Sequence, residues 1–505
     1  MDDFIIIDKF DQVLMRLETP MLDKIYKTKE DLFQRAQESL NVPLLEYPNF
    51  DGLNKKDKGS VGAAVERCWF GLSRNSRQES DFANLGVELK VTPYKRNPSK
   101  SLDDFCAYSA KERLRCSEIN YFKEIENSRF EDSHCYQKMK ETLLMFYEYL
   151  KEQPVENRFI SKVALLSLIE QQIDLKNLIN IIELSDFDLQ VIRQDWEIIC
   201  KKIREGRAHE LSEGDTTILG AATHGKNKSD LTAQPFSSIP AMRRTFAIKQ
   251  GYMSYLLRRF VLNKSTTYGK VLREEDDLTK NSFEEIIQAR LKPFYNKTES
   301  ELRLITGYEK NAKNKFAIYV SRLLKINCND ITQTEEFQKS NIAVKTIRIS
   351  RKINKKGIAK HHIEQSMSFS QFKPLQLITE KVWEESELYE EMTQRFLLVV
   401  FEENEKGEIF LKKSMFWSIP ESDLEKVEET WCETIKVLKH GVHFIEKYGK
   451  RYNDLPGMKF NGVSHVRPKA SNSKDVDLLP DGGFITKQCF WLNNTYIERV
   501  IGLKS

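Results

Sequence analysis

Two acidic residues and a lysine lie within ten positions of one another, in the segment 80–93 (SDFANLGVELKVTP). Asp81, Glu88 and Lys90 are the residue types that phosphodiester hydrolysis needs, because two carboxylates can hold Mg²⁺ against the phosphoryl oxygens and a lysine can orient or help deprotonate a water. The spacing alone carries little weight: with 75 acidic and 79 basic residues among 505, about two such matches are expected by chance. An exposed strand with a surface glutamate and lysine is the alternative interpretation.

The residues around Glu88 have the alternating pattern of a β-strand. Glu88 and Lys90 alternate with three aliphatic residues, which predicts a strand that packs on one face and carries both polar side chains on the other. Asp81 precedes this strand in a turn-like stretch before Gly86, from which its carboxylate can reach the same face. The three side chains are therefore expected to converge.

Two neighbouring segments add charged groups. Residues 58–71 (KGSVGAAVERCWFG) predict a helix with small residues on one face, and Glu66 near its middle is a candidate further acid at the metal site. A solvated helix glutamate is the ordinary alternative. Downstream, the basic residues Lys111, Arg113 and Arg115 alternate along the chain, which is typical of a strand edge that contacts phosphates.

The size and charge of the chain limit the classes of protein to which it can belong. A chain of 505 residues exceeds the roughly 250–300 residues of a single core, so two large domains are expected. Hydrophobic residues make up 40% and charged residues 30%, as in a soluble globular protein. The formal net charge of +4 is too small for binding by bulk charge, so any DNA contacts must come from local patches.

The cysteines and the apolar segments indicate a cellular compartment. The eight cysteines include no Cys-x-x-Cys pair, which suggests neither a zinc site nor a disulfide framework. The N-terminal segment lacks the basic flank and the length of a signal peptide, and no apolar stretch reaches the roughly 18 residues of a membrane span. We therefore expect a cytoplasmic protein with reduced thiols and no membrane partner.

The chain contains an internal repeat. Residues 195–206 (DWEIICKKIREG) and 430–441 (TWCETIKVLKHG) both predict an amphipathic helix that has a tryptophan at its second position and ends at a glycine. Related aromatic segments, 246–252 (FAIKQGY) and 490–496 (FWLNNTY), follow in the same order, 50 and 59 residues after the tryptophans. We interpret the pattern as a duplication, and two unrelated aromatic helices are the alternative.

The repeat sets the expected domain boundaries. The polar, charge-dense stretch 263–280 lies between the two halves and is predicted to be a linker. The first domain then covers residues 1–262, and the second covers residues 281–505. Each is long enough to form a core of its own.

These residues resemble the signature of a known family, the MutH family of DNA nucleases, which cleave at GATC. The similarity extends over the first 260 or so residues of the chain. The matching segments are Lys58-Gly59 with Glu66, Asp81-Phe82, the run 85–93 (LGVELKVTP), and the helix and aromatic segment within 195–252.

The resemblance implies a fold, a cofactor and roles for individual residues. The implied fold class is α/β, with two tandem restriction-endonuclease-like domains, each a mixed sheet flanked by helices. The implied cofactor is Mg²⁺, held by Asp81 and Glu88. Lys90 would be the catalytic lysine, Glu66 an accessory catalytic acid and Lys58 a DNA contact.

The second half resembles the family most clearly in its last part. Residues 465–472 (HVRPKASN) are similar to the loop with which the family contacts its site, so Arg467 and Lys469 are expected to contact either guanine or phosphates. The first half has a different sequence there, 220–228 (GAATHGKNK), which leaves its base-reading residues undetermined. Its candidate DNA contacts are His224, Lys226 and Lys228.

The second copy of the strand motif has lost an acid. In residues 336–347 (EFQKSNIAVKTI), Ala343 stands where the first copy has Glu88. A site with fewer anionic ligands is expected to hold Mg²⁺ poorly. We therefore predict that the second domain is catalytically inactive and has a DNA-binding and regulatory role.

A tandem of this length resembles type II restriction enzymes that hydrolyse double-stranded DNA at GATC. With one intact centre per chain, two copies are expected to meet on the DNA to cut both strands, and a DNA methyltransferase is the expected functional partner. A mismatch-repair nicking endonuclease is one alternative, although that role needs a single such domain. A sequence-specific DNA-binding protein with a vestigial nuclease motif is the other, although Asp81, Glu88 and Lys90 are all present.

Overall fold

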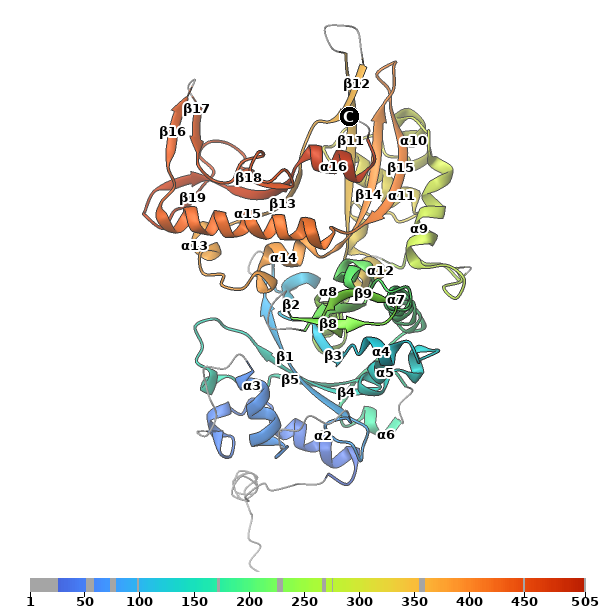
Figure 1. The fold of residues 1–505 in the computed structure, drawn as a ribbon, viewed down its shortest axis with the longest axis vertical. Coiled ribbons are helices and arrows are strands. Elements are labelled where there is room, and N and C mark those ends of the chain that lie inside the picture. Colours follow the sequence, from blue (N-terminus) through green and yellow to red (C-terminus); the bar gives the residue numbers. More distant parts are fainter. Residues whose placement is uncertain are drawn as a thin grey trace, which may run out of the picture. The chain divides into compact units, whose positions relative to one another are not determined.

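Two compact units make up the chain (Figure 1). Unit 1 comprises Met1–Leu211 with Thr216–Thr266, and unit 2 comprises Ser212–Asp215 with Thr267–Ser505. The computed structural model describes residues 26–50, 59–72, 79–97, 100–169, 173–224, 230–265, 269–274, 276–353, 359–447 and 450–503.

The boundary between the units falls within the stretch 263–280, for which the sequence predicts a linker. The later part of this stretch is packed into unit 2. Val271 is 1% exposed, and the backbone N–H groups of Val271 and Leu272 donate to the carboxylate of Glu336 at 2.9 and 3.0 Å. The buried side chain of Val271 and these two hydrogen bonds hold a segment whose composition is that of a solvated linker.

Unit 1 contains a five-stranded mixed sheet and a three-stranded antiparallel sheet. In the larger sheet, of order β2-β1-β4-β5-β6, the pairs β1–β4 and β5–β6 are parallel and the others are antiparallel. The smaller sheet has the order β3-β10-β7, and the hairpin β8–β9 precedes β10. The strands are β1 (Glu88–Arg96), β2 (Tyr108–Ala110), β3 (Leu114–Glu118), β4 (Glu141–Glu148), β5 (Lys162–Ser167), β6 (Asn180–Glu183), β7 (Leu219–Thr223), β8 (Leu231–Gln234), β9 (Ser237–Met242) and β10 (Arg244–Ile248).

Helices cover both faces of the larger sheet. The long helix α7 begins at a capping box formed by Ser185 and Asp188, and its apolar stripe enters the core that the larger and smaller sheets share. A second core lies between the opposite face of the sheet and the helices α2, α3 and η3. The helices up to the end of unit 1 are α2 (Lys29–Glu38), η1 (Leu44–Glu46), α3 (Ser60–Ala63), η3 (Ala64–Trp69), η4 (Phe105–Ala107), α4 (Tyr121–Glu124), η5 (Phe130–Asp132), α5 (His134–Met139), η6 (Val155–Asn157), α6 (Ile173–Lys176), α7 (Asp186–Arg204), η7 (Ala208–Glu210), α8 (Gln250–Leu256) and η9 (Leu257–Val261), with η8 (Glu213–Asp215) in the short segment assigned to unit 2.

Strand β1 is covered on both faces, so the expectation of a strand packed on one face is wrong. Leu89 is 1% exposed on one face, and Glu88 is 3% exposed on the other. Residues of β3, α4 and α5 line the cavity into which Glu88 projects. The alternating pattern identifies residues that share a face, but it does not reveal that later segments of the chain close over that face.

Unit 2 repeats this architecture with a four-stranded mixed sheet of order β12-β11-β14-β15. Its parallel pair β11–β14 corresponds to β1–β4, and its antiparallel sheet β13-β21-β18 corresponds to β3-β10-β7. The strands are β11 (Ile342–Ile353), β12 (Ala359–Ile363), β13 (Met367–Phe372), β14 (Arg395–Glu403), β15 (Ile409–Trp417), β16 (Phe444–Lys447), β17 (Lys450–Asn453), β18 (Ser464–Pro468), β19 (Val476–Leu478), β20 (Phe484–Thr486) and β21 (Gln488–Leu492). The helices are α9 (Phe283–Leu291), η10 (Lys292–Phe294), α10 (Glu299–Thr306), α11 (Lys315–Leu323), η11 (Ile331–Gln333), α12 (Glu335–Ser340), α13 (Pro374–Leu377), η12 (Trp383–Glu385), α14 (Glu387–Met392), α15 (Glu421–His440) and α16 (Asn494–Val500).

The sequence repeat marks corresponding elements of the two units. Trp196 on α7 and Trp431 on α15 are both buried. Phe246 on β10 and Phe490 on β21 are also buried, each on the central strand of its three-stranded sheet. The predicted α/β fold with two tandem mixed-sheet domains is confirmed.

The structure also bears on membranes and thiols. None of the helices in the described part of the chain has the length and apolar character needed to cross a lipid bilayer. All eight cysteines are free, and Cys432 is the exposed one.

Candidate active site

Asp81 and Glu88 are held together at the start of β1. A tight turn joins them, and in this turn Gly86 has a φ of +67°, the left-handed conformation that glycine adopts without strain. The Asp81 carboxylate accepts the backbone N–H of Leu89 at 2.9 Å, and the Glu88 carboxylate accepts the backbone N–H of Asp81 at 3.3 Å. The local chain therefore fixes both acids relative to the strand.

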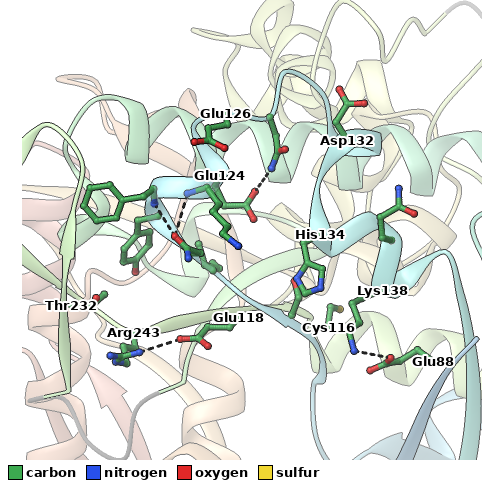
Figure 2. Close-up of a pocket in the computed structure, with 18 of the residues that line it drawn as sticks. Glu88, Cys116, Glu118, Glu124, Glu126, Asp132, His134, Lys138, Thr232 and Arg243 are labelled. Atoms are coloured by element: carbon green, nitrogen blue, oxygen red, sulfur yellow. Dashed lines mark hydrogen bonds and ion pairs between the residues drawn. The ribbon is translucent and has the colours of Figure 1, made fainter. Parts of the chain in front are cut away.

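Two lysines share the carboxylate of Glu88. Lys90, on the same strand, places Nζ 2.7 Å from Oε1. Lys138, on α5, places Nζ 3.0 Å from Oε2 (Figure 2). The side chain of Lys138 is 13% exposed. Sequence analysis missed Lys138, because it reaches Glu88 through the parallel pairing of β1 with β4, the strand that follows α5. No local spacing in the sequence signals that contact.

The acids of the site repel one another. Burial raises the pKa of Asp81, and the nearby charge of Glu88 raises it further. The pKa of Glu66, on η3, is also raised by burial and by Asp81. Burial favours a lower pKa for Lys90, but Glu88 and Asp81 outweigh this effect and raise it. The structure thus brings together the four residues predicted from sequence for the catalytic centre.

The oxygen donors of this centre fit a hard divalent cation such as Mg²⁺. Burial and then mutual repulsion raise the pKa of Asp81 and of Glu66, and a bound cation would counter both effects by stabilising the ionised carboxylates. Within the described residues, no three acidic, histidine or cysteine side chains are placed to enclose an ion by themselves. Mg²⁺ commonly uses one or two carboxylates and completes its shell with water and phosphate oxygens, so Asp81 and Glu88 would be sufficient protein ligands.

A cavity of about 920 Å³ opens beside Glu88 and Lys90. Figure 2 shows the Lys138–Glu88 contact in its wall and, elsewhere in the wall, the contact between Arg243 and Glu118. The wall carries both signs of charge, with five carboxylate and four lysine or arginine side chains. The acidic residues are Glu88, Glu118, Glu124, Glu126 and Asp132, and the basic ones are Lys90, Lys123, Lys138 and Arg243. A wall of this mixed charge suits a phosphate that arrives together with a cation better than a phosphate alone.

The predicted DNA contacts of unit 1 that the structure describes, Lys111, Arg113 and His224, do not line this cavity. Lys111 lies over the ring of Tyr149 at 4.6 Å, and Arg113 is half-buried between β2 and β3. His224 is exposed directly after β7. The remaining candidates, Lys58, Lys226 and Lys228, lie outside the described residues.

The corresponding position of unit 2 has lost the acid beside its lysine. Ala343 pairs with Phe396 across β11 and β14, as Glu88 pairs with Thr142 across β1 and β4. The acid that remains from the sequence motif, Glu336, is 3% exposed, and both of its oxygens accept backbone N–H groups. Its hydrogen bonds hold the chain at the start of unit 2, which leaves this centre without an available carboxylate pair.

The predicted DNA contacts of unit 2 are exposed. Arg467 lies on β18, and its guanidinium stacks on the ring of Trp491 at 4.7 Å. Lys469 follows the strand and donates from Nζ to the backbone carbonyl of Phe369 at 2.6 Å. Both side chains are therefore accessible and held in place by their neighbours.

The fold and the centre define a class of protein. A mixed sheet whose central parallel pair carries two carboxylates and a lysine at the start of one strand is the arrangement of a nuclease with a restriction-endonuclease-like fold. Comparison with known proteins agrees. A family model described as "DNA mismatch repair enzyme MutH" matches residues 70–177, which include Asp81, Glu88, Lys90 and Lys138 but not Glu66.

The chain is 34% identical to the type II restriction enzyme Sau3AI of Staphylococcus aureus, over 94% of this chain and 99% of the relative. It is 28% identical to the DNA mismatch repair protein MutH of Shigella flexneri serotype 5b and 27% identical to that of Escherichia coli O17:K52:H18. Each of these two matches covers 47% of this chain and 94% of the relative. The chain therefore belongs to the MutH-related family of type II restriction enzymes, and it is a DNA endonuclease.

Lys138 gives a first testable expectation. The substitution Lys138→Ala removes one of the two cations that position Glu88, and we expect DNA cleavage to slow by about 10–100-fold, the usual effect of losing a residue that orients a ligand. Lys123→Ala is the matched control, because Lys123 lines the same cavity and carries the same charge but is exposed. Single-turnover cleavage rates measure both variants. Equal losses in the two would mean that Lys138 contributes only general positive charge.

Proposed function

We propose that this protein is a type II restriction endonuclease that cuts both strands of double-stranded DNA at GATC and requires Mg²⁺. The observation that carries the proposal is the convergence of Asp81, Glu88 and Lys90 in unit 1 of a chain that matches a type II restriction enzyme along nearly all of its length. The resemblance of these segments to the MutH signature supports the choice of GATC.

The residues of unit 1 have distinct roles in this proposal. Asp81 and Glu88 would hold the metal, which neutralises charge on the phosphoryl oxygens and makes a bound water more acidic. Lys90 extends from β1 beside Glu88 and would orient the attacking water and stabilise the charge of the scissile phosphate. Lys138 holds the second oxygen of Glu88, and Glu66 adds a further acid at the edge of the centre.

Unit 2 would bind DNA without cutting it. Its centre lacks the acid at Ala343, while Arg467 and Lys469 stay exposed beside it. One intact centre per chain then requires two copies of the protein on the DNA for a double-strand break, and a second GATC site would favour that encounter. The restriction role further implies a cytoplasmic protein that is paired with a DNA methyltransferase.

Plasmid digestion tests this function. We expect the intact protein to linearise plasmids that contain GATC in the presence of Mg²⁺, to leave them uncut in EDTA, and to be inactive as Lys90→Ala. Ends sequenced at GATC would establish the specificity, and adenine- and cytosine-methylated plasmids would show which modification protects. Nicked circles as the stable product would favour a mismatch-repair nicking enzyme instead. Binding without cleavage by the intact protein would favour a DNA-binding protein with a vestigial centre.

A further inference from the structure

Unit 2 keeps the lysine of the strand motif and brings a second lysine to it. Lys345 on β11 donates from Nζ to the carbonyl of Ser368 at 3.2 Å, and Lys469 donates to the carbonyl of Phe369 at 2.6 Å. These are consecutive carbonyls of β13, next to the irregularity in its pairing with β21. Two ammonium groups from distant parts of the chain are therefore anchored on neighbouring peptide units.

Lys345 and the equivalent lysine of unit 1, Lys90, have different acidic neighbours. In unit 1, Lys90 has the carboxylate of Glu88 at 2.7 Å, whereas Lys345 forms no ion pair within 4 Å among the described residues. The acid whose charge acts on Lys345 is Glu391 of α14, whose carboxylate accepts the backbone N–H and the hydroxyl of Ser370. Burial and the charge of Lys469 lower the pKa of Lys345, which Glu391 offsets only in part.

Corresponding elements of the two units carry different charged residues. In unit 1 the strand carries the acid and the helix that precedes the parallel partner strand, α5, carries Lys138. In unit 2 the strand carries Lys345 beside Ala343, and the corresponding helix, α14, carries Glu391. Two lysines and one carboxylate leave one net positive charge, which equals in magnitude the single negative charge of a phosphodiester group.

We propose that Lys345 and Lys469 form a phosphate site that binds one phosphodiester group of the DNA backbone without a metal ion. The inference rests on the proposed DNA binding by unit 2 and identifies where and how that unit would hold the backbone. Lys345 is half-buried and Lys469 is exposed, so the pair is open to a ligand on the side of Lys469. Arg467, exposed two residues earlier, would contact the same DNA segment.

The salt dependence of binding tests the site in the full-length protein. Each neutralised phosphate contributes about 0.9 to the slope of log K against log salt concentration. With a duplex that carries two GATC sites, in EDTA so that no cleavage occurs, Lys345→Met should weaken binding at least about tenfold and reduce the magnitude of this slope by about 0.9. Because both lysines would contact one phosphate, Lys469→Met should have a smaller effect in the Lys345→Met background than by itself.

Two controls separate charge from structure. Lys406→Met makes the same change on the exposed turn after β14. Lys345 pairs with Leu398 of β14, and the strand continues five residues beyond that pair, so the turn lies roughly 17 Å away along the strand at about 3.3 Å per residue. Lys406→Met should leave the slope unchanged, and Lys345→Arg should retain most of it. A melting temperature close to that of the parent shows that a variant is folded.

Several outcomes would overturn the inference. An unchanged slope in a folded Lys345→Met variant would do so. So would a loss of affinity in Lys469→Met that is the same with and without Lys345, since the two lysines would then contact different phosphates. If the intact protein still cuts GATC plasmids with Mg²⁺ in either case, the proposed function stands and only the phosphate site is wrong. Failure of the intact protein to bind or cut GATC DNA would instead reject the proposed function.

Discussion

Cleavage of GATC DNA is expected to fall by on the order of 10³-fold or more in the variant Glu88→Gln, while binding of the same DNA is largely retained. Glu88 is the residue on which the centre depends most: it would hold the metal, it fixes Lys90 and Lys138, and it accepts the backbone N–H of Asp81. The amide has nearly the same shape, but it lacks the negative charge that both lysines need. Single-turnover cleavage and anisotropy binding assays would measure the two effects separately.

Unit 2 offers a matched control for this experiment. Glu402 on β14 is 8% exposed and, like Glu88, is a sheet carboxylate beside two basic side chains, Lys412 at 2.7 Å and His361 at 3.0 Å. Glu402→Gln therefore makes the same chemical change outside the centre and weakens similar contacts to basic side chains. We expect it to change the rate of DNA cleavage little. Comparable losses in both variants would show that Glu88 acts through stability, and full activity of Glu88→Gln would reject the assigned centre.

The variant Asp195→Asn is expected to destabilise unit 1 with a distinctive pH dependence. Asp195 on α7 is 2% exposed, and its carboxylate accepts the N–H groups of Thr217, Ile218 and Leu219 at 2.7, 2.6 and 2.8 Å. These bonds anchor the start of β7, the strand that leads to His224. Asparagine turns an NH₂ group toward the backbone donors, which should cost about 1–3 kcal/mol through an unmade buried hydrogen bond.

The direction of the pH effect follows from the pKa of Asp195. Burial raises this pKa to about 6 from the ordinary 3.8, although Lys249 and the three N–H groups lower it. Ionisation of Asp195 therefore costs more in the folded than in the unfolded chain. The protonated carboxyl group stabilises the fold, and this stabilisation is complete below pH 3.8 and is lost as the pH rises through about 6. The stability advantage of the parent over Asp195→Asn should shrink by about 3 kcal/mol at most over that interval, at 1.36 kcal/mol per pKa unit.

Thermal unfolding of both proteins between pH 4 and pH 7 would measure this change. Thr430 occupies the corresponding position of unit 2, and its hydroxyl bonds to that of Ser464 at 2.6 Å. Thr430→Val removes a buried hydrogen bond but no titrating group, so its effect on stability should not vary with pH in this range. A pH-independent difference between the parent and Asp195→Asn would contradict the assigned pKa.

The residues of the catalytic centre could be predicted from sequence only with the help of their context. Asp81, Glu88 and Lys90 form a pattern that chance also produces. The strand periodicity, the upstream Glu66 and the extended resemblance to the MutH family made that pattern credible. The structure does bring these four residues together. The repeated order of the Trp helices and aromatic strands likewise predicted two domains of one architecture, because local periodicity reports which residues share a buried face.

The alternating pattern around Glu88 was enough to place Glu88 and Lys90 on one face of a strand, with Asp81 in the turn before it. Ala343 was enough to show that the second copy lacks an acid. Only the tertiary structure decided what surrounds them. Lys138 reaches Glu88 because β1 and β4 pair in parallel across about fifty residues, and Glu336 bonds to backbone that appeared to be linker. Such contacts depend on which distant segments pack together, and that information is absent from spacing along the chain.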